Sequence, residues 1–370
     1  MKNIKTIIIL YPSFERGGAT VNLINFVNAC EKRKIQTYLI TNINDKTKRK
    51  HFNKNIKIIK LNDTFKINSL KRLFTSLSSS LKLIKLFYSI KSENSLVFSF
   101  QSHILPIVIS KLFFRKIIFR NSEDIIEATR YADQRFSAYI IFFLKILFYN
   151  FSDGIIANST KSKNSLNRII LNKKTKLIFN PYLKKIYKGR KITRKKYILS
   201  VGRLCKQKNQ KTIIEAFYLF LKKNPNYKLI LIGHGPDEIK LKEICKKLKI
   251  QDKVLFKGWV SDPKKFYLNS KVLVFPSLYE GLPNTLIDSI NYDLPCISSK
   301  CSGAEDILTR KYGIFVDHNN SKILAKKIEY VVKNYSFFSN RVSKIKKKLF
   351  RFLIKSQISK YLNYCDDILN

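Results

Sequence analysis

The segment that decides the fold is FPSLYEGLPNTLIDSINYDLPCISS, which spans residues 275–299. It overlaps the apolar run KVLVFP at 271–276, which is typical of a buried strand, and the loop SLYEGLPN then leads into the helical pattern NTLIDSINY. Pro283 suits the first turn of that helix. Glu280 and Asp288 stand on either side of the helix start with seven residues between them. The segment therefore predicts a strand, a loop and a helix, with an acidic pair where the loop and the helix meet.

Around this segment, short apolar runs alternate with helix-length segments along the chain, from TIIIL at 6–10 to YGIFV at 312–316. Such alternation is typical of βα units and parallel sheets. It predicts two doubly wound α/β domains, one over residues 1–185 and one over residues 195–350. The basic stretch 180–197 is expected to connect them, either as a solvated linker or as the lining of a cleft between them. A helix over about 352–370 is expected to pack back on the first domain.

The composition limits the class of protein. The 370 residues carry a formal net charge of +47, from 72 Lys and Arg against 25 Asp and Glu. Part of this charge can follow from the base composition of a genome, and the rest predicts attraction to nucleic acid, an anionic membrane surface or phosphorylated substrates. The six cysteines form no CxxC pair, so neither a zinc site nor a disulfide framework is indicated.

The longest apolar tract, SAYIIFFLKILFYNFS at 137–152, contains Lys145. It is shorter than the roughly 20 residues that a spanning helix needs. We therefore expect a cytoplasmic protein whose contact with a membrane, if it has one, is peripheral.

The acidic pair predicts a type of ligand. Open α/β sheets bind ligands at the carboxyl ends of their strands, where loops and helix N-termini meet. Glu280 is expected in such a loop, and Asp288 lies one helical turn after Asn284 on the same face of the helix. A carboxylate accepts two hydrogen bonds from neighbouring sugar hydroxyls at short distance. Two carboxylates so placed can hold two sugar rings, which predicts a sugar nucleotide with a transferred sugar at one end and a ribose at the other.

With this pair the sequence resembles the retaining nucleotide-sugar glycosyltransferases of family 4, the group 1 glycosyl transferases. Their signature is a Glu, seven residues and a second Glu, and Asp288 is one methylene shorter than that second Glu. The resemblance extends to ILSVGRLCKQKNQKTIIEAF at 198–217, LILIGHGPDEIKLK at 229–242, VLFKGWV at 254–260 and CSGAEDIL at 301–308. It implies the GT-B fold, in which two Rossmann-like domains face each other across an interdomain cleft, with the acceptor bound by the first domain and the nucleotide sugar by the second.

The resemblance also implies the site residues. The implied catalytic residues are Glu280, Arg203, Lys208 and His103. The implied donor-binding residues are Gly17, Gly18, Gly233, Asn284, Thr285, Leu286 and Asp288. Glu280 would orient the sugar and Asp288 would hold the ribose, while the paired glycines would let backbone amides approach the donor phosphates and the acceptor.

The departing nucleoside diphosphate builds up negative charge, and preorganised cations stabilise it. Arg203 offers a planar fork and Lys208 a point charge, which is what a metal ion would otherwise supply. No Asp-x-Asp pair stands at a predicted strand end. We therefore expect chemistry without a metal or another cofactor, and the resemblance implies that the configuration of the sugar is retained.

Three functions remain open at this point. The first is transfer of one hexosyl or N-acetylhexosaminyl group from a nucleotide sugar, with UDP as the expected nucleotide, to a lipid-linked or lipopolysaccharide glycan. Such an enzyme would serve bacterial O-antigen, capsule or lipopolysaccharide biosynthesis at the inner face of the plasma membrane. The second is a basic nucleic-acid-binding protein, but Walker loops, zinc fingers and an aromatic RNA-binding signature are missing, so nucleic acid is not the expected partner. The third is a silent homologue in a complex, against which Glu280, Arg203 and Lys208 argue.

One helix is predicted in detail over residues 66–91. Helical spacing places Leu70, Leu73, Leu77, Leu81 and Ile84 on one face, and this face is expected to cover the first sheet. Phe74 and Phe87, which stand among lysines, are then available to a bilayer.

Overall fold

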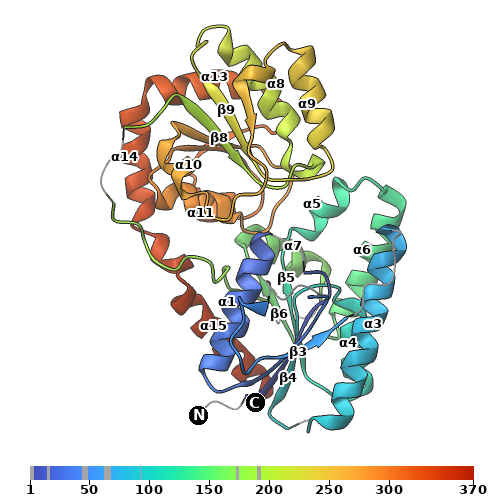
Figure 1. Ribbon diagram of the computed structural model, residues 1–370. Coiled ribbons are helices and arrows are strands. Elements are labelled where there is room, and N and C mark those ends of the chain that lie inside the picture. The colour runs from blue at the N-terminus through green and yellow to red at the C-terminus, as the bar shows by residue number, and fades with distance from the viewer. Residues whose placement is uncertain are drawn as a thin grey trace. The chain divides into compact units, whose positions relative to one another are not determined.

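The computed structural model describes residues 4–14, 17–43, 49–61, 68–91, 93–171, 175–189 and 193–370, without the side chains of 68–73. The chain divides into two compact units (Figure 1). The first unit is Met1–Tyr182 with Phe352–Asn370, and the second is Leu183–Arg351. Each unit is built on a parallel sheet with helices on both faces, so the predicted α/β class is confirmed.

The first unit holds a seven-stranded parallel sheet in the order β3-β2-β1-β4-β5-β6-β7. The strands are β1 Thr6–Tyr11, β2 Gln36–Thr41, β3 Lys57–Lys60, β4 Ser95–Ser99, β5 Ile117–Asn121, β6 Gly154–Ala157 and β7 Thr175–Leu177. The helices are α1 Gly18–Lys32, α3 Asn68–Ser89, α4 Ile104–Leu112, α5 Ile125–Arg130, α6 Arg135–Tyr149, α7 Thr160–Ile169 and α15 Ile354–Leu369.

Both faces of this sheet are buried, which explains why its strands are continuous apolar runs. Along β1, Ile7 packs with Phe26 of α1 and Tyr361 of α15 on one face. Ile8 packs on the other face with helices that include α3, where Leu83 is fully buried. Helix α15 thus joins the sheet of the first unit although it comes from the end of the chain (Figure 1).

The helix predicted over 66–91 does cover the first sheet, but the prediction that Leu77 and Leu81 face the core is wrong, and Ile84 is half-buried. In α3, Leu77 and Leu81 are exposed by 43% and 63%, whereas Phe87 is buried. The inner face carries Ser79 and Ser80, whose hydroxyls donate to a backbone carbonyl of the same helix. Small polar residues can face a core when their hydrogen bonds are satisfied in this way, and an apolar pattern does not reveal them. The side chains of Leu70 and Leu73 lie outside the described residues.

The second unit holds a six-stranded parallel sheet in the order β10-β9-β8-β11-β12-β13. The strands are β8 Tyr197–Val201, β9 Lys228–Ile232, β10 Val254–Phe256, β11 Val272–Phe275, β12 Cys296–Ser299 and β13 Ile314–Val316. The α-helices are α8 Gln210–Leu221, α9 Glu238–Lys247, α10 Lys264–Asn269, α11 Asn284–Asn291, α12 Ala304–Leu308, α13 Ser321–Lys333 and α14 Tyr335–Lys346. Short 3₁₀ turns cover Lys206–Lys208, Gln251–Lys253 and Leu349–Phe352.

The core of the second unit lies between this sheet and the helices α8 and α13. Phe217 of α8 and Ile328 of α13 are fully buried against Leu231 and Val274 of the sheet. The opposite face is held partly by Arg194, which precedes β8. Its guanidinium donates to the carbonyl oxygens of Tyr267, Leu268, Ser270, Tyr292 and Asp293, at 2.6–3.1 Å.

These carbonyls lie at the C-terminal ends of α10 and α11, where unpaired carbonyl groups and the helix dipole both favour a cation. Arg194 belongs to the basic stretch 180–197, which was expected to connect the two domains. At Arg194 this stretch is therefore part of the folded second unit.

Candidate active site

Each sheet has one point where the order of its strands reverses. In the first sheet this point lies between β1 and β4, and in the second it lies between β8 and β11. Successive crossovers leave such a point in opposite directions, so the loops at the carboxyl ends of the two strands diverge and leave room for a ligand. The connections after these strands carry Gly17 and the first helical residue Gly18 (after β1), His103 (after β4), Arg203 and Lys208 (after β8) and Glu280 (after β11). The implied catalytic residues thus all follow strands at the two reversal points.

An ion pair occupies the reversal point of the second sheet. The ammonium of Lys208 donates to Oε1 of Glu280, and the two side chains are only 19% and 11% exposed. The same ammonium lies 5.1 Å from the centroid of the Phe275 ring, whose negative face attracts a cation. Partial burial strengthens the pair, because less water screens the two charges. The structure therefore brings together two of the residues that the sequence predicted as catalytic.

The loops that carry this pair are tied to each other by further hydrogen bonds. The backbone N–H of Leu278 donates to the carbonyl of Gln207 at 2.8 Å, and the Gln207 amide donates to the carbonyl of Tyr279 at 2.9 Å. Asn209 adopts the left-handed conformation, with φ of 55°, and its amide donates to the carbonyl of His318 at 2.6 Å. These contacts fix the positions of Lys208 and Glu280 in advance of any ligand.

Arg203 lies at the start of the same loop after β8. Its side chain is exposed, while its carbonyl accepts a hydrogen bond from the amide of Gln210 at 2.9 Å. The backbone of this loop is further held by a bond from Leu204 N–H to the carbonyl of His234 at 2.9 Å. Arg203 is therefore an exposed residue on a fixed backbone, which suits a phosphate-binding residue.

Gly233 supports this loop from the neighbouring strand. Its φ is +140°, and a Cβ added there would lie 1.9 Å from the carbonyl oxygen of Gly202. Only glycine fits this close approach. The described contacts therefore give Gly233 a packing role beneath the loop of Arg203, and its contact with a donor stays a prediction.

Helix α11 carries the remaining predicted donor residues. Asn284 and Thr285 are half-buried in its first turn, and the Thr285 hydroxyl donates to the carbonyl of Val201 at 3.3 Å. Leu286 is fully buried, and its N–H donates to the carbonyl of Pro283 at 3.0 Å. The Leu286 side chain thus serves the core, which leaves the polar groups of the first turn as the better donor contacts.

Asp288 lies one turn further along α11. Burial and then the Asp288 carboxylate raise the pKa of Tyr267 well above its usual value. Burial and the same carboxylate also raise the pKa of Tyr292. The carboxylate therefore lies close to two tyrosines, both of which remain protonated at neutral pH. Its contact with a ribose stays a prediction.

The reversal point of the first sheet is built differently. Gly17 precedes α1, a helix of 15 residues, and a Cβ added to Gly17 would meet no atom within 4 Å. Gly18 is the first residue of the helix and is exposed. The N-terminus of a helix of this length favours an anion through its N–H groups and its dipole. The two glycines thus leave space that a ligand can use.

His103 precedes α4 and is held on two sides. Its Nδ1 lies 2.8 Å from the hydroxyl of Ser99, and its ring stacks on Phe119 with centroids 4.7 Å apart. The Ser99 hydroxyl donates to the carbonyl of Gln101 at 2.9 Å, so its one proton is already used. Nδ1–H of His103 therefore donates to Ser99, and Nε2 is left as a hydrogen-bond acceptor.

The charge state of His103 follows from its surroundings. Burial of the ring, followed by the positive charges of Lys145 and Arg120, lowers the pKa of His103 to about 3. The ring is consequently neutral at physiological pH. His103 can accept a hydrogen bond from a hydroxyl through Nε2, but it is not a cation for phosphate.

Residues 183–349 match the family model of the group 1 glycosyl transferases. An uncharacterized glycosyltransferase of Methanocaldococcus jannaschii is 32% identical over 281 residues, which are 70% of this chain and 68% of that protein. The chain belongs to the group 1 glycosyltransferases. The family and the enzyme class implied by the sequence resemblance are thereby confirmed.

Two further comparisons concern a sequence relative and a solved structure of this glycosyltransferase's fold. A Campylobacter jejuni enzyme named GalNAc-alpha-(1->4)-GalNAc-alpha-(1->3)-diNAcBac-PP-undecaprenol alpha-1,4-N-acetyl-D-galactosaminyltransferase is 30% identical over 234 residues, 62% of this chain and 64% of that enzyme. Anabaena HepE, solved in complex with UDP and glucose, has a TM-score of 0.80 at 17% identity and covers 98% of this chain and 100% of its own. The second likeness confirms the GT-B fold.

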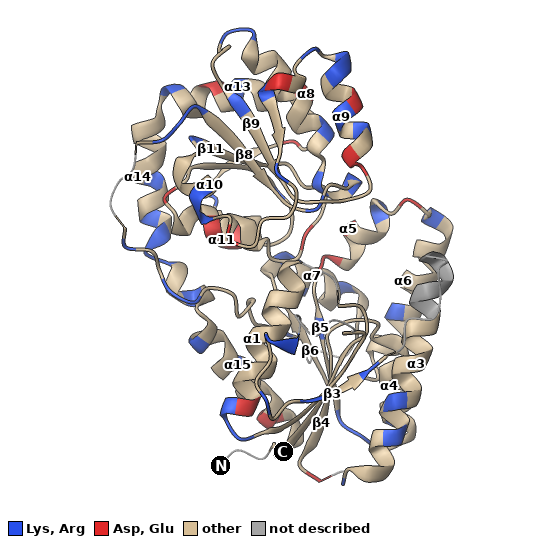
Figure 2. Cartoon of the chain, viewed as in Figure 1, with Lys and Arg blue, Asp and Glu red and all other residues tan. Residues whose placement is uncertain are grey.

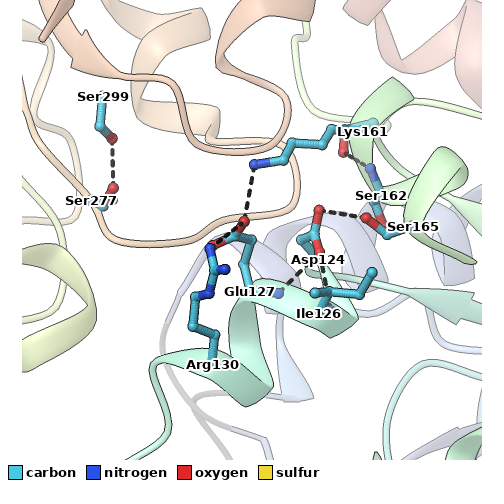
Figure 3. A network of polar contacts seen from close by, with 10 residues as sticks. Asp124, Ile126, Glu127, Arg130, Lys161, Ser162, Ser165, Ser277 and Ser299 are labelled. Carbon is cyan, nitrogen blue, oxygen red and sulfur yellow. Dashed lines mark hydrogen bonds and ion pairs between the residues drawn. The ribbon is translucent and has the colours of Figure 1, made fainter. Parts of the chain in front are cut away.

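Other acidic residues of the glycosyltransferase are occupied in structural contacts (Figure 3). Asp124 is fully buried, accepts from the N–H groups of Ile126 and Glu127, and also accepts from the Ser165 hydroxyl at 3.0 Å. Glu127 lies 3.4 Å from the ammonium of Lys161. These carboxylates cap and join α5 and α7, which makes them unsuitable as catalytic groups.

Figure 3 also shows a bond within the second unit. The Ser299 hydroxyl donates to the carbonyl of Ser277 at 2.5 Å and thereby ties the loop after β11 to β12. The sequence did not predict this bond, and it did not predict the contacts that Gln207 and Asn209 make. A left-handed residue directly before a helix favours Asn, and that was the one available signal at Asn209.

In the described part of the chain, no three His, Cys, Asp or Glu side chains lie close enough together to hold a metal ion. No helix within the same ranges has the length and hydropathy needed to cross a bilayer.

Proposed function

We propose that this glycosyltransferase moves one sugar, with retention of its configuration, from a UDP-sugar to a lipid-linked or lipopolysaccharide glycan. The observation that carries the proposal is the half-enclosed pair of Lys208 and Glu280 at the reversal point of the second sheet. It combines a cation for the diphosphate and a carboxylate for the sugar hydroxyls in one place. The second unit would thus bind the donor and the first unit the acceptor.

The pair suggests how the donor is received. Without a ligand, Lys208 and Glu280 neutralise each other, which keeps a mostly buried carboxylate from standing unpaired. A diphosphate offers Lys208 a stronger partner, and the hydroxyls of the sugar offer Glu280 hydrogen-bond donors. Both residues then exchange their mutual bond for bonds to the donor. Arg203, which is exposed on the same loop, adds a second cation for the phosphates.

The same residues account for the transfer step. When the sugar leaves, negative charge collects on the departing UDP, and Lys208 and Arg203 are positioned to stabilise it. We propose that these two side chains replace a metal ion and that no other cofactor takes part. In a front-face attack, the leaving phosphate helps to deprotonate the acceptor hydroxyl, while Glu280 orients the sugar and stabilises the transition state.

The acceptor is proposed from the relatives and from the charge. The C. jejuni relative is named for an acceptor with a diphospho-undecaprenol carrier. A chain with a net charge of +47 is attracted to diphosphates and to anionic lipid headgroups alike. We therefore propose that a hexosyl or N-acetylhexosaminyl group is added to a surface glycan, such as O-antigen, capsule or lipopolysaccharide. The enzyme would act from the cytoplasm as a peripheral protein at the inner face of the membrane.

Donor hydrolysis and thermal protection by a panel of nucleotide sugars test this proposal. UDP-sugars should raise the melting temperature of the wild type and should be hydrolysed slowly without an acceptor. The variant Glu280→Gln keeps the shape of the side chain but should lose nearly all turnover. Lys211→Ala is the control, because Lys211 follows Lys208 by three residues and, among the described residues, its ion pair is an exposed one with Glu215.

The proposal fails if no nucleotide sugar protects the wild type, or if Glu280→Gln turns over its donor at the normal rate. Protection by UDP-sugars without any hydrolysis or transfer would instead support a silent homologue that has kept its donor site.

A further inference from the structure

Helix α6 presents an unusual outer surface for a protein in water. Among its 15 residues only Tyr149 is buried. Exposed apolar side chains recur at three- or four-residue spacing along one stripe, which we call the α6 surface: Phe136 (81%), Tyr139 (60%), Ile140 (47%), Phe143 (66%) and Leu147 (47%). A continuous apolar stripe of this size on a folded protein marks an interaction site.

A second exposed stripe lies on α3. It consists of Phe74, Leu77, Leu81 and Tyr88, and the last of these is 81% exposed. Helix α4 packs against both α3 and α6, and the three helices cover the same face of the first sheet (Figure 1). Leu77 and Leu81, which the sequence pattern assigned to the core, thus belong to the outer surface of this layer.

The charged residues of these three helices are all basic. Helices α3, α4 and α6 contain no Asp or Glu and carry seven basic residues: Lys71, Arg72, Lys82, Lys85, Lys111, Arg135 and Lys145. Of these, Lys111 is paired with Asp153 at 2.7 Å. Figure 2 shows blue segments on α3 and α4 and no red on these three helices where their residues are described. A partner for this layer must therefore offer both an apolar interior and negative charge.

We infer that the α6 surface inserts into the headgroup and acyl boundary of an anionic phospholipid bilayer. A bilayer satisfies both demands, because acyl chains take up the apolar stripe while anionic headgroups pair with the flanking basic residues. A second copy of the chain fits poorly, since it would bring the same positive charge to the contact. The inference rests on the proposed function, because a lipid-linked acceptor is presented at such a surface.

The inner side of α6 connects this surface to the reversal point of the first sheet. Tyr149 contacts Phe119, with ring centroids 4.2 Å apart, and its ring lies 6.0 Å from that of His103. Lys145 contributes to the lowered pKa of His103, so it lies close to that ring as well. The helix that meets the lipid is therefore the helix that packs behind His103. A glycan carried on a lipid would reach the first unit where its predicted acceptor residues stand.

Vesicle binding tests the inference directly. The wild type and the triple variant Phe136→Ser, Phe143→Ser, Leu147→Ser are sedimented with vesicles of phosphatidylcholine and phosphatidylglycerol, and separately with pure phosphatidylcholine. The control variant is Ile239→Ser, Ile323→Ser, Phe350→Ser, which removes three exposed apolar side chains from the second unit. We expect the apparent affinity for anionic vesicles to fall at least about tenfold in the first variant. The control should bind like the wild type.

Protection by UDP is measured on the same samples, so that failure of docking and failure of the proposed function can be told apart. A variant that loses vesicle binding but keeps UDP protection supports the inference. Equal vesicle binding by the wild type and the α6 variant overturns it. Equal binding to neutral and anionic vesicles overturns the role of the basic residues. A soluble dimer that the α6 substitutions convert to monomer would also overturn it, in favour of self-association.

A fluorescent reporter covers the case in which the triple variant does not fold. The chain has a single tryptophan, Trp259, in the second unit. The variant Trp259→Phe, Phe143→Trp moves the only indole to the α6 surface with little change in size. Its emission should shift to the blue on addition of anionic vesicles, while Trp259 in the wild type should show no such shift. An unchanged emission from Trp at position 143 would contradict insertion.

Discussion

The two reversal points of this glycosyltransferase have the same topology but opposite chemistry. The point in the second sheet is charged, with Lys208 paired to Glu280 and the exposed Arg203 on the same loop. At the point in the first sheet, the described residues include Gly17, where an added Cβ would meet no atom within 4 Å, and the uncharged ring of His103. The same topology thus carries an ion pair in one unit and an uncharged imidazole in the other. Specific chemistry depends on loop residues rather than on the sheet that carries them.

The charged point should give the largest effect on mutation. Lys208→Ala removes the partner of a mostly buried carboxylate and one of the two proposed phosphate ligands. We expect turnover to fall by about 10²- to 10³-fold and the free energy of unfolding of the second unit to fall by about 3 kcal/mol. Steady-state kinetics and urea denaturation measure the two effects. The double variant Lys208→Met, Glu280→Gln should recover most of the stability but none of the turnover, because it leaves no buried charge unpaired.

A pair of glycine substitutions separates packing from ligand access at the two points. Gly233→Ala forces a Cβ against the carbonyl of Gly202 at positive φ, and we expect it to cost about 3 kcal/mol of stability. Gly17→Ala meets no neighbouring atom, so its stability should stay within about 0.5 kcal/mol of the wild type. It should nevertheless slow transfer, because its methyl group enters the space proposed for the ligand. Thermal melts and kinetics of the two variants test this contrast, which equal losses of stability would refute.

The reversal point of the first sheet should show a smaller effect that depends on pH. The pKa of His103 is about 3 in the folded protein and about 6.5 in the unfolded chain. Below pH 6.5 the unfolded chain binds a proton at this site that the folded protein does not. Stability from this residue is therefore complete above pH 6.5 and is lost as the pH falls toward 3, by about 2 kcal/mol at pH 5. His103→Gln should flatten this part of the pH profile of urea denaturation, and an unchanged slope would show that the ring is not held neutral.

The parts of the fold that sequence revealed were those decided by local pattern. Strands such as β1 are buried on both faces, so their apolar runs are continuous and easily found. The inner face of α3 was missed because Ser79 and Ser80 face the core with their hydroxyls bonded inside the helix. Arg194 was missed for another reason, since its carbonyl partners lie 73–99 residues away in the sequence.

In the candidate site, too, the sequence identified some residues correctly and left the contacts of others unpredicted. Spacing and motif pointed to Lys208 and Glu280, which the structure joins in an ion pair. The same reasoning assigned Leu286 and Gly233 to donor binding, whereas their described contacts are packing contacts. A motif shows only that a residue type is needed at a position. Leu286 and Gly233 can meet that need by packing alone, one in the core and the other beneath a loop. Only the contacts made by residues remote in sequence distinguish the two cases.

Titration of UDP into four forms of the protein tests the exchange of partners at Lys208 most directly. The forms are the wild type, Glu280→Gln, Lys208→Met and the double variant, and UDP carries no sugar for Glu280 to hold. If the diphosphate competes with Glu280 for Lys208, UDP should bind more tightly to Glu280→Gln than to the wild type and more weakly to Lys208→Met. The gain from Glu280→Gln should vanish when Lys208 is already Met. The same change in affinity in both backgrounds, or no change in either, would show that Lys208 and Glu280 do not act together at the donor.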